Sequence, residues 1–276
     1  MYIKQEKRAL SKPKRSIEKG DAPEYYDGVV EKYFDSAHQL IKRRILVKEG
    51  SKYRRVLAEG DCPYPEDSQR HFLTLWMSGA REEEAIALTT EGWKWNDEAI
   101  RYKLMPVYKK REKVRDSSGD VVYRAVEEKV MQQDGSIQTQ TIYRPLGRRK
   151  EVYRDHYVPR DIPLGEKFID LVHTLREDGV KYLLYKRQQF SRDPIINEAC
   201  TRGTVYNRIV ELHEDLFPHS IRALHGRFID DRFGDLVKDR DGLLQEHFKW
   251  STREMASYYR RTRDVAKVMG IKKLPE

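Results

Sequence analysis

The feature that most restricts the possible folds is a change in hydrophobic period along the chain. Apolar residues follow a helical spacing within residues 24–48 and 68–92. Residues 99–163 are instead rich in Tyr, Val, Ile and Thr, with turn signals at Ser117–Asp120 and Asp134–Ser136 that are typical of β-hairpins. The helical spacing then returns, and helices are expected at residues 165–177, 201–214, 219–232, 238–248 and 252–268.

This order of segments predicts the fold class. Helices, then a β segment, then helices indicate an α+β fold, namely a mainly helical domain with a small antiparallel sheet and an extended β-hairpin insert over residues 99–163. Residues 1–22 are basic and show no apolar period, so they are expected to form a flexible basic arm.

Charge and composition favour a protein that binds polyanions and argue against a membrane-spanning or secreted protein. The chain has 54 Lys and Arg against 45 Asp and Glu, a formal net charge of +9, and a basic protein attracts polyanions such as nucleic acid. No apolar stretch approaches the roughly 18 residues of a membrane-spanning helix, and residues 1–20 lack the apolar centre of a secretory signal. Cys62 and Cys200 lie far apart without metal-ligand spacing, which fits a reducing cytoplasm. We therefore expect a cytoplasmic protein.

Three short motifs carry residues that suit one chemistry. In the first, Gly79 precedes Arg81, and Glu84 follows three residues later. The glycine frees the backbone, so that Arg81 can stand at the start of a helix. In the second, one helical turn separates His219 from Arg222, so both side chains can point at one phosphate. The third lies near the carboxyl end, where a Trp-Ser pair is followed by two adjacent tyrosines.

Taken in order, these motifs resemble the signature blocks of the tyrosine recombinases, the phage-integrase family. That resemblance implies a tyrosine-recombinase-like catalytic domain and a role for each residue. Arg81 and Arg222 would grip the scissile phosphate, and His219 would handle a proton or bind the phosphate. Glu84 would buttress the fold, and Trp250 would pack against the phosphate site and orient it.

The resemblance also indicates the nucleophile. In the family, a His or Trp stands nine residues before the reactive tyrosine, which assigns Tyr259 when the count starts at Trp250. Tyr258 is the alternative if the register shifts by one residue. Counting from His247 instead would place the nucleophile at Ala256, which cannot react.

A lysine from a turn between two strands would complete the family's site by protonating the leaving 5′ oxygen. Lys150, in a basic turn before the end of the β segment, is our choice, and Lys109 and Lys110 are the alternatives. The same long hairpin could lie along a DNA groove through a set of basic residues: Lys109, Lys110, Arg148 and Arg149.

These residue types suit phosphoryl transfer from DNA. Arginine is always protonated, planar and bidentate, so two of them can stabilise the charge that builds on a five-coordinate phosphorus. A tyrosine hydroxyl has a pKa near 10 and needs nearby cations to react. Attack would form a 3′-phosphotyrosyl link and free a 5′ hydroxyl, and a second hydroxyl could reseal the strand without ATP. We expect no metal and no cofactor.

The resemblance also suggests an organisation and a partner. Residues 23–54 would form an N-terminal helix, interpreted as a remnant of a core-binding domain, and residues 55–276 the catalytic domain. The C-terminal tail, residues 260–276, would dock on a neighbouring subunit. The expected assembly is a homotetramer on two sites of double-stranded DNA, in a nucleoid-associated protein that acts in recombination or integration of a mobile element.

Two other functions remain open. A type IB topoisomerase or a telomere-resolvase-like strand transferase would use the same residues without exchanging strands between two sites. A DNA-binding protein that kept the fold without catalysis is the second alternative. The family often has a second His directly after the second arginine, where this chain has Ala223.

Overall fold

The computed structural model describes residues 25–108, 112–131, 137–148, 151–188, 193–250 and 253–256. The chain divides into two units. The larger unit combines Met1–Met105 with Asp155–Glu276, and the smaller unit is Pro106–Arg154.

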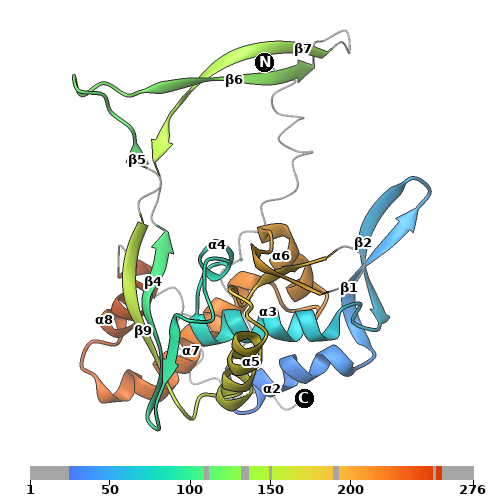
Figure 1. Cartoon of the computed structure of the whole chain (residues 1–276), viewed down its shortest axis with the longest axis vertical. Coiled ribbons are helices and arrows are strands. Elements are labelled where there is room, and N and C mark those ends of the chain that lie inside the picture. The colour runs from blue at the N-terminus through green and yellow to red at the C-terminus, as the bar shows by residue number, and fades with distance from the viewer. Residues whose placement is uncertain are drawn as a thin grey trace, which may run out of the picture. The chain divides into compact units, whose positions relative to one another are not determined.

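The larger unit is built around the helix α3 (Pro65–Ser78), which is buried along most of its length. Its apolar residues Phe72, Leu75 and Trp76 are fully buried in the core. The helix packs against α5 (Gly165–Glu177), α6 (Arg202–Val210) and α7 (Pro218–Phe233) (Figure 1). The remaining helices described in this unit are α2 (Val29–Asp35), η1 (Ser36–His38), α4 (Glu82–Ala85), η2 (Gly234–Leu236) and α8 (Arg240–Phe248).

Antiparallel strands accompany these helices. A three-stranded sheet has the order β3 (Trp93–Trp95), β4 (Ala99–Tyr108), β9 (Glu151–Pro159), and the whole of residues 109–150 connects its last two strands. Two hairpins stand apart from it. They pair β1 (Ile41–Glu49) with β2 (Lys52–Gly60), and β10 (Tyr185–Arg187) with β11 (Pro194–Ala199).

The smaller unit consists of paired strands. The long pair is β6 (Tyr123–Met131) with β7 (Ile137–Pro145), in register from Tyr123↔Pro145 to Met131↔Ile137. The short pair is β5 (Glu112–Lys113) with β8 (Gly147–Arg148). The predicted turn at Ser117–Asp120 is present, with Gly119 at a φ of 89°. The other predicted turn, Asp134–Ser136, lies outside the described residues.

The predicted α+β class is confirmed, and so are the helices expected from 165 to 248. The prediction of a helix over residues 24–48, and with it the single N-terminal helix over 23–54, was wrong. Only Val29–His38 is helical, and the hairpin Ile41–Gly60 follows and runs across the predicted boundary at residue 55. A two-residue loop, Gly50-Ser51, closes this hairpin, with Gly50 at a φ of 61°. Such primed turns favour a hairpin over a helix.

Several expectations fall outside the part of the chain that the structure describes. These are the arm 1–22, most of the helix 252–268 and the tail 260–276. Among the described helices, none is long and apolar enough to span a membrane.

A buried arginine fixes the β1–β2 hairpin to the helices. Arg43 is fully buried, and its guanidinium donates to the carbonyl oxygens of Glu211 at 3.1 Å, Leu212 at 3.3 Å and Ser36 at 3.0 Å, and to that of Gln39. The carbonyls of Glu211 and Leu212 follow the last residue of α6, and those of Ser36 and Gln39 follow the ends of α2 and η1, where backbone oxygens carry partial negative charge. The cation therefore satisfies these helix ends at once.

Replacing Arg43 with Ala should lower the free energy of unfolding by about 3 kcal/mol, because four carbonyl oxygens lose a guanidinium donor and a cavity remains. The matched control is Arg54→Ala, which removes an exposed arginine from the same hairpin and should cost less than about 0.5 kcal/mol. Urea denaturation of both variants measures the difference. Equal costs would show that Arg43 does not anchor the hairpin.

Candidate active site

The turn between α3 and α4 needs a glycine for two reasons. Gly79 ends α3 in the left-handed region, with φ 55° and ψ 18°. A Cβ at this position would also lie 2.7 Å from Cδ2 of His225 and 2.9 Å from Cε1 of Phe248. The turn places Arg81 directly before α4, as its N-cap in extended conformation. The predicted role of the glycine, to free the backbone ahead of Arg81, agrees with this geometry.

A buried carboxylate lies between the two arginines of the motifs. Glu84 is 2% exposed, and its Oε1 lies 3.5 Å from Nη1 of Arg81. Its Oε2 accepts from the backbone N–H of Arg81 at 2.8 Å and lies 3.5 Å from Nη1 of Arg222. Two arginines from distant parts of the sequence thus meet at one carboxyl group.

The two arginines differ in exposure. The side chain of Arg81 is 44% exposed, whereas that of Arg222 is 2% exposed. Arg222 donates to the carbonyl oxygen of Gly79, and its guanidinium lies over the Phe248 ring at 4.4 Å and the Trp250 ring at 5.9 Å. An anion arriving from solvent therefore reaches Arg81 directly, while Arg222 contributes its charge from within the protein.

His219 lies within the electrostatic reach of both arginines. Burial, and then the charges of Arg222 and Arg81, lower the pKa of His219 to about 4. The imidazole is consequently neutral at pH 7 and can donate one N–H and accept one hydrogen bond. Arg81 and Arg222 thus meet at Glu84, and His219 is close enough for both charges to act on it.

Trp250 lies beside this group, as expected. It is 6% exposed and stacks on Phe248, with ring centroids 4.6 Å apart and planes at 18°. Because Phe248 also covers the guanidinium of Arg222, the two aromatic rings exclude water from one side of that cation. Phe248 was not among the predicted site residues, although its position two residues before Trp250 could have suggested it.

A histidine network beneath the site was also missed. Nδ1 of His225 donates to the carbonyl oxygen of Trp76 at 2.6 Å, so in the neutral ring Nε2 accepts from Nε2 of His247 at 2.8 Å. Nε2 of His156 donates to the carbonyl oxygen of Met77 at 2.7 Å. The network ties the end of α3 to α7, α8 and β9. The spacing His219-x-x-Arg222-x-x-His225 places all three on one helix face and was the available signal.

The remaining predicted residues lie outside the described part of the chain. They are Tyr259 and Tyr258, the general-acid candidates Lys150, Lys109 and Lys110, and the DNA-binding candidate Arg149. Arg148 belongs to β8. The three lysines do, however, directly follow β4 or precede β9, which are neighbouring strands of one sheet.

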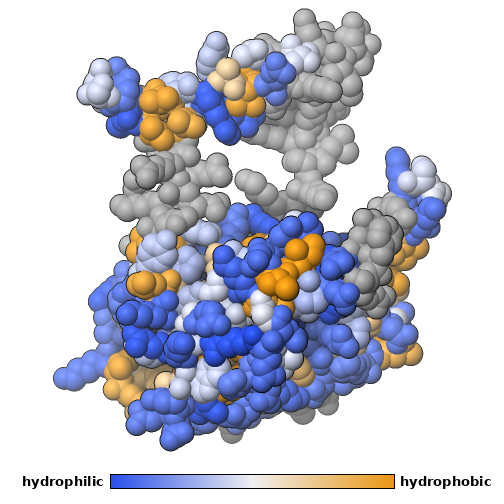
Figure 2. All heavy atoms as spheres, viewed as in Figure 1, coloured by the Kyte–Doolittle hydropathy of each residue, from blue (hydrophilic) through white to orange (hydrophobic). Residues whose placement is uncertain are grey.

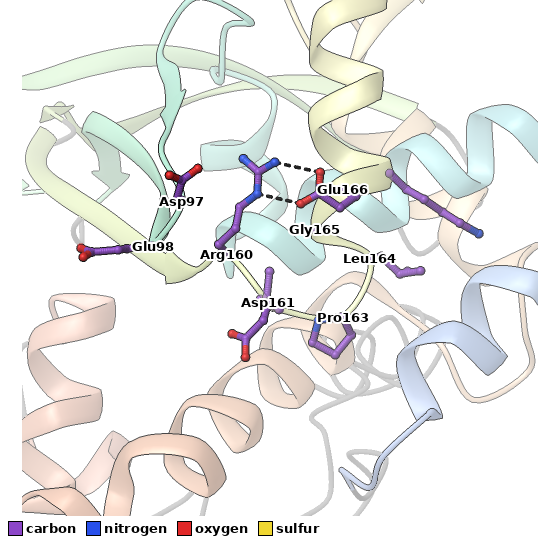
Figure 3. A pocket seen from close by; sticks show the side chains of 10 residues that line it. Asp97, Glu98, Arg160, Asp161, Pro163, Leu164, Gly165 and Glu166 are labelled. Carbon is purple, nitrogen blue, oxygen red and sulfur yellow. Dashed lines mark hydrogen bonds and ion pairs between the residues drawn. The ribbon is translucent and has the colours of Figure 1, made fainter.

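The larger unit also has a pocket that is unsuited to phosphate. Four carboxylates and two cations line it, and within it Arg160 binds Glu166 through two hydrogen bonds of 2.7 and 2.8 Å (Figure 3). The carboxylates Asp97, Glu98 and Asp161 complete a lining of negative net charge, which repels a phosphodiester. Among the described residues, no group of three or more His, Cys, Asp or Glu could hold a metal ion.

Solved structures of known proteins share a similar backbone fold with this chain. The chain is similar to two structures of the site-specific recombinase XerH bound to difH substrates, after and before cleavage. The identities are 11% and 10%, the alignments cover 91% of this chain and 53% and 55% of XerH, and the TM-scores are 0.47 and 0.45. It is also similar to the Tn1549 transposon integrase in complex with transposon right-end DNA, with 11% identity, coverage of 90% and 66%, and a TM-score of 0.40.

The chain thus spans about half the length of the XerH chains it is similar to. No protein-family model and no curated protein sequence matches it.

The crowding at Gly79 gives a testable stability difference. Gly79→Ala should cost about 1 kcal/mol for the left-handed backbone and a further ~1–3 kcal/mol for contacts with His225 and Phe248. Gly179→Ala is the control, because Gly179 has a similar φ of 69° but no atom within 4 Å of the position that a Cβ would take. Gly179→Ala should therefore cost only about 1 kcal/mol for the left-handed backbone. Equal losses in urea denaturation would contradict the packing argument.

The lowered pKa of His219 predicts a pH dependence of stability. Between about pH 4 and pH 6.5 the unfolded chain binds a proton at His219 that the folded chain does not, so stability should rise with pH across that window. Burial also lowers the pKa of His71, so both histidines contribute to the pH dependence of the native protein. A comparison with a variant that lacks the His219 imidazole gives the contribution of His219 alone. The advantage of the native protein over His219→Gln in unfolding free energy should be larger at pH 7 than at pH 4.5. If the difference in unfolding free energy between the native protein and His219→Gln were the same at both pH values, the pKa of His219 would not be lowered by folding.

Proposed function

We propose that the chain cleaves and rejoins DNA strands as a site-specific recombinase or integrase of the tyrosine type, through a 3′-phosphotyrosyl intermediate. The observation that supports this most directly is the convergence of Arg81 and Arg222 on Glu84, with His219 within the electrostatic reach of both arginines. Two guanidiniums and a neutral imidazole at one place suit the binding of a phosphodiester, whose non-bridging oxygens gain charge during displacement.

In this proposal Arg81 receives the scissile phosphate, since it is the exposed guanidinium. Arg222 adds its charge from a water-poor position, where an ionic interaction is stronger than in bulk water. His219 donates its N–H to a phosphate oxygen. Its low pKa makes it a weak base, which favours this role over that of a proton acceptor. An arriving phosphate would raise that pKa by offsetting the two arginines.

The covalent step then belongs to residues beyond the described part. The Tyr259 hydroxyl attacks phosphorus and gives its proton to solvent water, and the P–O5′ bond breaks. The leaving 5′ oxygen takes a proton from a lysine, with Lys150 preferred over Lys109 and Lys110. Attack of a 5′ hydroxyl on the phosphotyrosyl link reverses the step and restores the tyrosine. Neither direction needs a metal or a cofactor.

The proposed partner is double-stranded DNA, with binding affinity supplied mainly by Lys and Arg contacts to phosphates. Lys109, Lys110, Arg148 and Arg149 are the proposed contacts of the smaller unit. A homotetramer on two DNA sites, assembled through exchange of the tail 260–276, is part of the same proposal.

One observation favours a second candidate, a DNA-binding protein of the same fold without catalysis. Arg222 is 2% exposed and already binds the Gly79 carbonyl and Glu84, as a purely structural arginine would. The two candidates differ in whether a covalent protein–DNA adduct forms. A topoisomerase or telomere resolvase would also form the adduct, but would yield relaxed plasmid or hairpin ends in place of joined recombinants.

The test is adduct trapping on a pool of nicked duplexes of randomised sequence, read on a denaturing gel. Strand cleavage next to the nick releases a short fragment and should leave the protein attached to DNA. Tyr259→Phe should abolish the adduct because it removes the nucleophilic oxygen, and Arg81→Ala should slow its formation by about 10²–10³-fold.

Tyr258→Phe is the matched control and should retain the adduct. Loss of the adduct in Tyr258→Phe but not in Tyr259→Phe would move the nucleophile by one residue. Absence of any adduct from the native protein, with DNA binding intact, would favour the non-catalytic alternative.

A further inference from the structure

The β1–β2 ribbon has no role in the site described above. Its nine residue pairs run from Ile41↔Gly60 to Glu49↔Lys52, and among the described residues no third strand pairs with it. In Figure 1 it extends away from α3 and from the rest of the helical body. A ribbon of nine residues per strand is about 30 Å long. Near its tip, Lys48, Lys52 and Arg54 are exposed and therefore available to a partner.

Exposed cations occupy both faces of the ribbon, and Figure 2 shows hydrophilic residues around its tip on the side in view. Paired residues share a face, so the register places Lys42 and Lys48 on one face and Lys52 and Arg54 on the other. All four are exposed. The exposed acids of the ribbon are Glu49 and Glu59, and at the base Lys42 lies opposite Glu59, so the net positive charge of exposed residues lies in the distal half. This charge complements a polyanion.

Two large apolar side chains lie among these cations. Leu46 and Leu57 are 52% and 57% exposed, on the same face as Lys42 and Lys48. They are diagonal neighbours on that face, and each pairs directly with an arginine, Leu46 with Arg55 and Leu57 with Arg44. A protein-binding surface would show a larger contiguous patch. A pair of apolar groups between cations suits the base edges of a groove, where thymine presents a methyl group.

The middle of the ribbon is joined to the candidate active site through α6. Glu211, after the end of α6, binds Arg55 of β2 at 3.4 Å and Arg208 of α6 at 2.9 Å. At the other end of α6, Arg202 binds Glu82 and Glu83, the residues that follow Arg81. The helix between Arg202 and Arg208 spans about 9 Å. A duplex held at Arg81 can thus reach the ribbon.

We propose that the β1–β2 ribbon enters the major groove of duplex DNA beside the cleaved phosphate. The groove of B-DNA, about 12 Å wide, admits a two-stranded ribbon. Lys48, Lys52 and Arg54 contact phosphates, and Leu46 and Leu57 contact base edges. The location of the ribbon beside the cleaved phosphate rests on the proposed function. The binding of duplex DNA by the ribbon does not depend on catalysis. The deep, narrow major groove of A-form RNA excludes this mode.

The first experiment compares two triple variants of the full chain that lose the same charge. Lys48→Ala/Lys52→Ala/Arg54→Ala removes the ribbon cations. The matched control, Lys94→Ala/Lys181→Ala/Lys238→Ala, removes three exposed lysines from elsewhere in the larger unit. Binding to a fluorescent 40-bp DNA duplex is followed by anisotropy from 50 to 300 mM salt.

The ribbon variant should bind at least tenfold more weakly at 150 mM salt. The slope of log K against log salt should fall by about 2.7 if each cation contacts one phosphate. The control should change the slope by less than one. Equal slopes for the two variants would overturn the proposal, and so would an equal loss on an A-form RNA duplex.

The second experiment uses Leu46→Ser/Leu57→Ser. Loss of apolar contacts should weaken DNA binding without altering the salt slope, because no ionic contact is removed. Unchanged DNA affinity would overturn the part of the proposal that concerns the two leucines. If the native protein is an oligomer in sedimentation velocity and this variant is not, the leucines belong to a protein interface, which would overturn that part as well.

Adduct trapping separates this proposal from the proposed function. At low salt and saturating protein, the ribbon variant should still form the covalent adduct, because none of its changes touches Arg81 or Tyr259. If the native protein forms no adduct but the salt slope falls as stated, the catalytic proposal fails and the ribbon proposal stands. If the native protein forms the adduct but the ribbon variant leaves the salt slope unchanged, the ribbon proposal fails and the catalytic proposal stands.

Discussion

The arrangement of the candidate site depends on one buried carboxylate. Glu84 binds the backbone and guanidinium of Arg81 and lies within ionic contact of Arg222, so it sets the spacing of two cations that would otherwise repel each other. Burying a charge is unfavourable unless it is paired, and here each partner stabilises the others. The carboxylate also offsets part of the positive charge available to a phosphate.

Packing beneath the carboxylate holds the peptide segments in place. Gly79 allows α3 to end close to α7 and α8, and its carbonyl accepts from Arg222. His225 links the last turn of α3 to His247 on α8, and Phe248, the residue after His247, covers the Arg222 guanidinium. The site is therefore assembled from three helix ends that are distant in sequence. A disturbance at any one of them would alter the distance between the two arginines.

The periodic helices and the convergence of Arg81, His219 and Arg222 could be predicted from the sequence, because local spacing and the family motifs describe them. The ribbon could not, since the run Ile45-Leu46-Val47 has no period that separates a strand from a helix. Buried Arg43 was equally unpredictable. Arginine is rarely buried, and the carbonyls it binds lie 168 and 169 residues away. Pairings of that kind depend on the tertiary fold, which no local pattern encodes.

The most direct measurement of the central claim compares a natural scissile phosphate with a methylphosphonate at the same position. The methyl group removes the negative charge that the two guanidiniums would stabilise. If both arginines act on one phosphate, Arg81→Ala and Arg222→Ala should slow adduct formation strongly on the phosphate substrate and at least tenfold less on the methylphosphonate. Equal losses on both substrates would show that the arginines do not act on that charge, and would contradict the account.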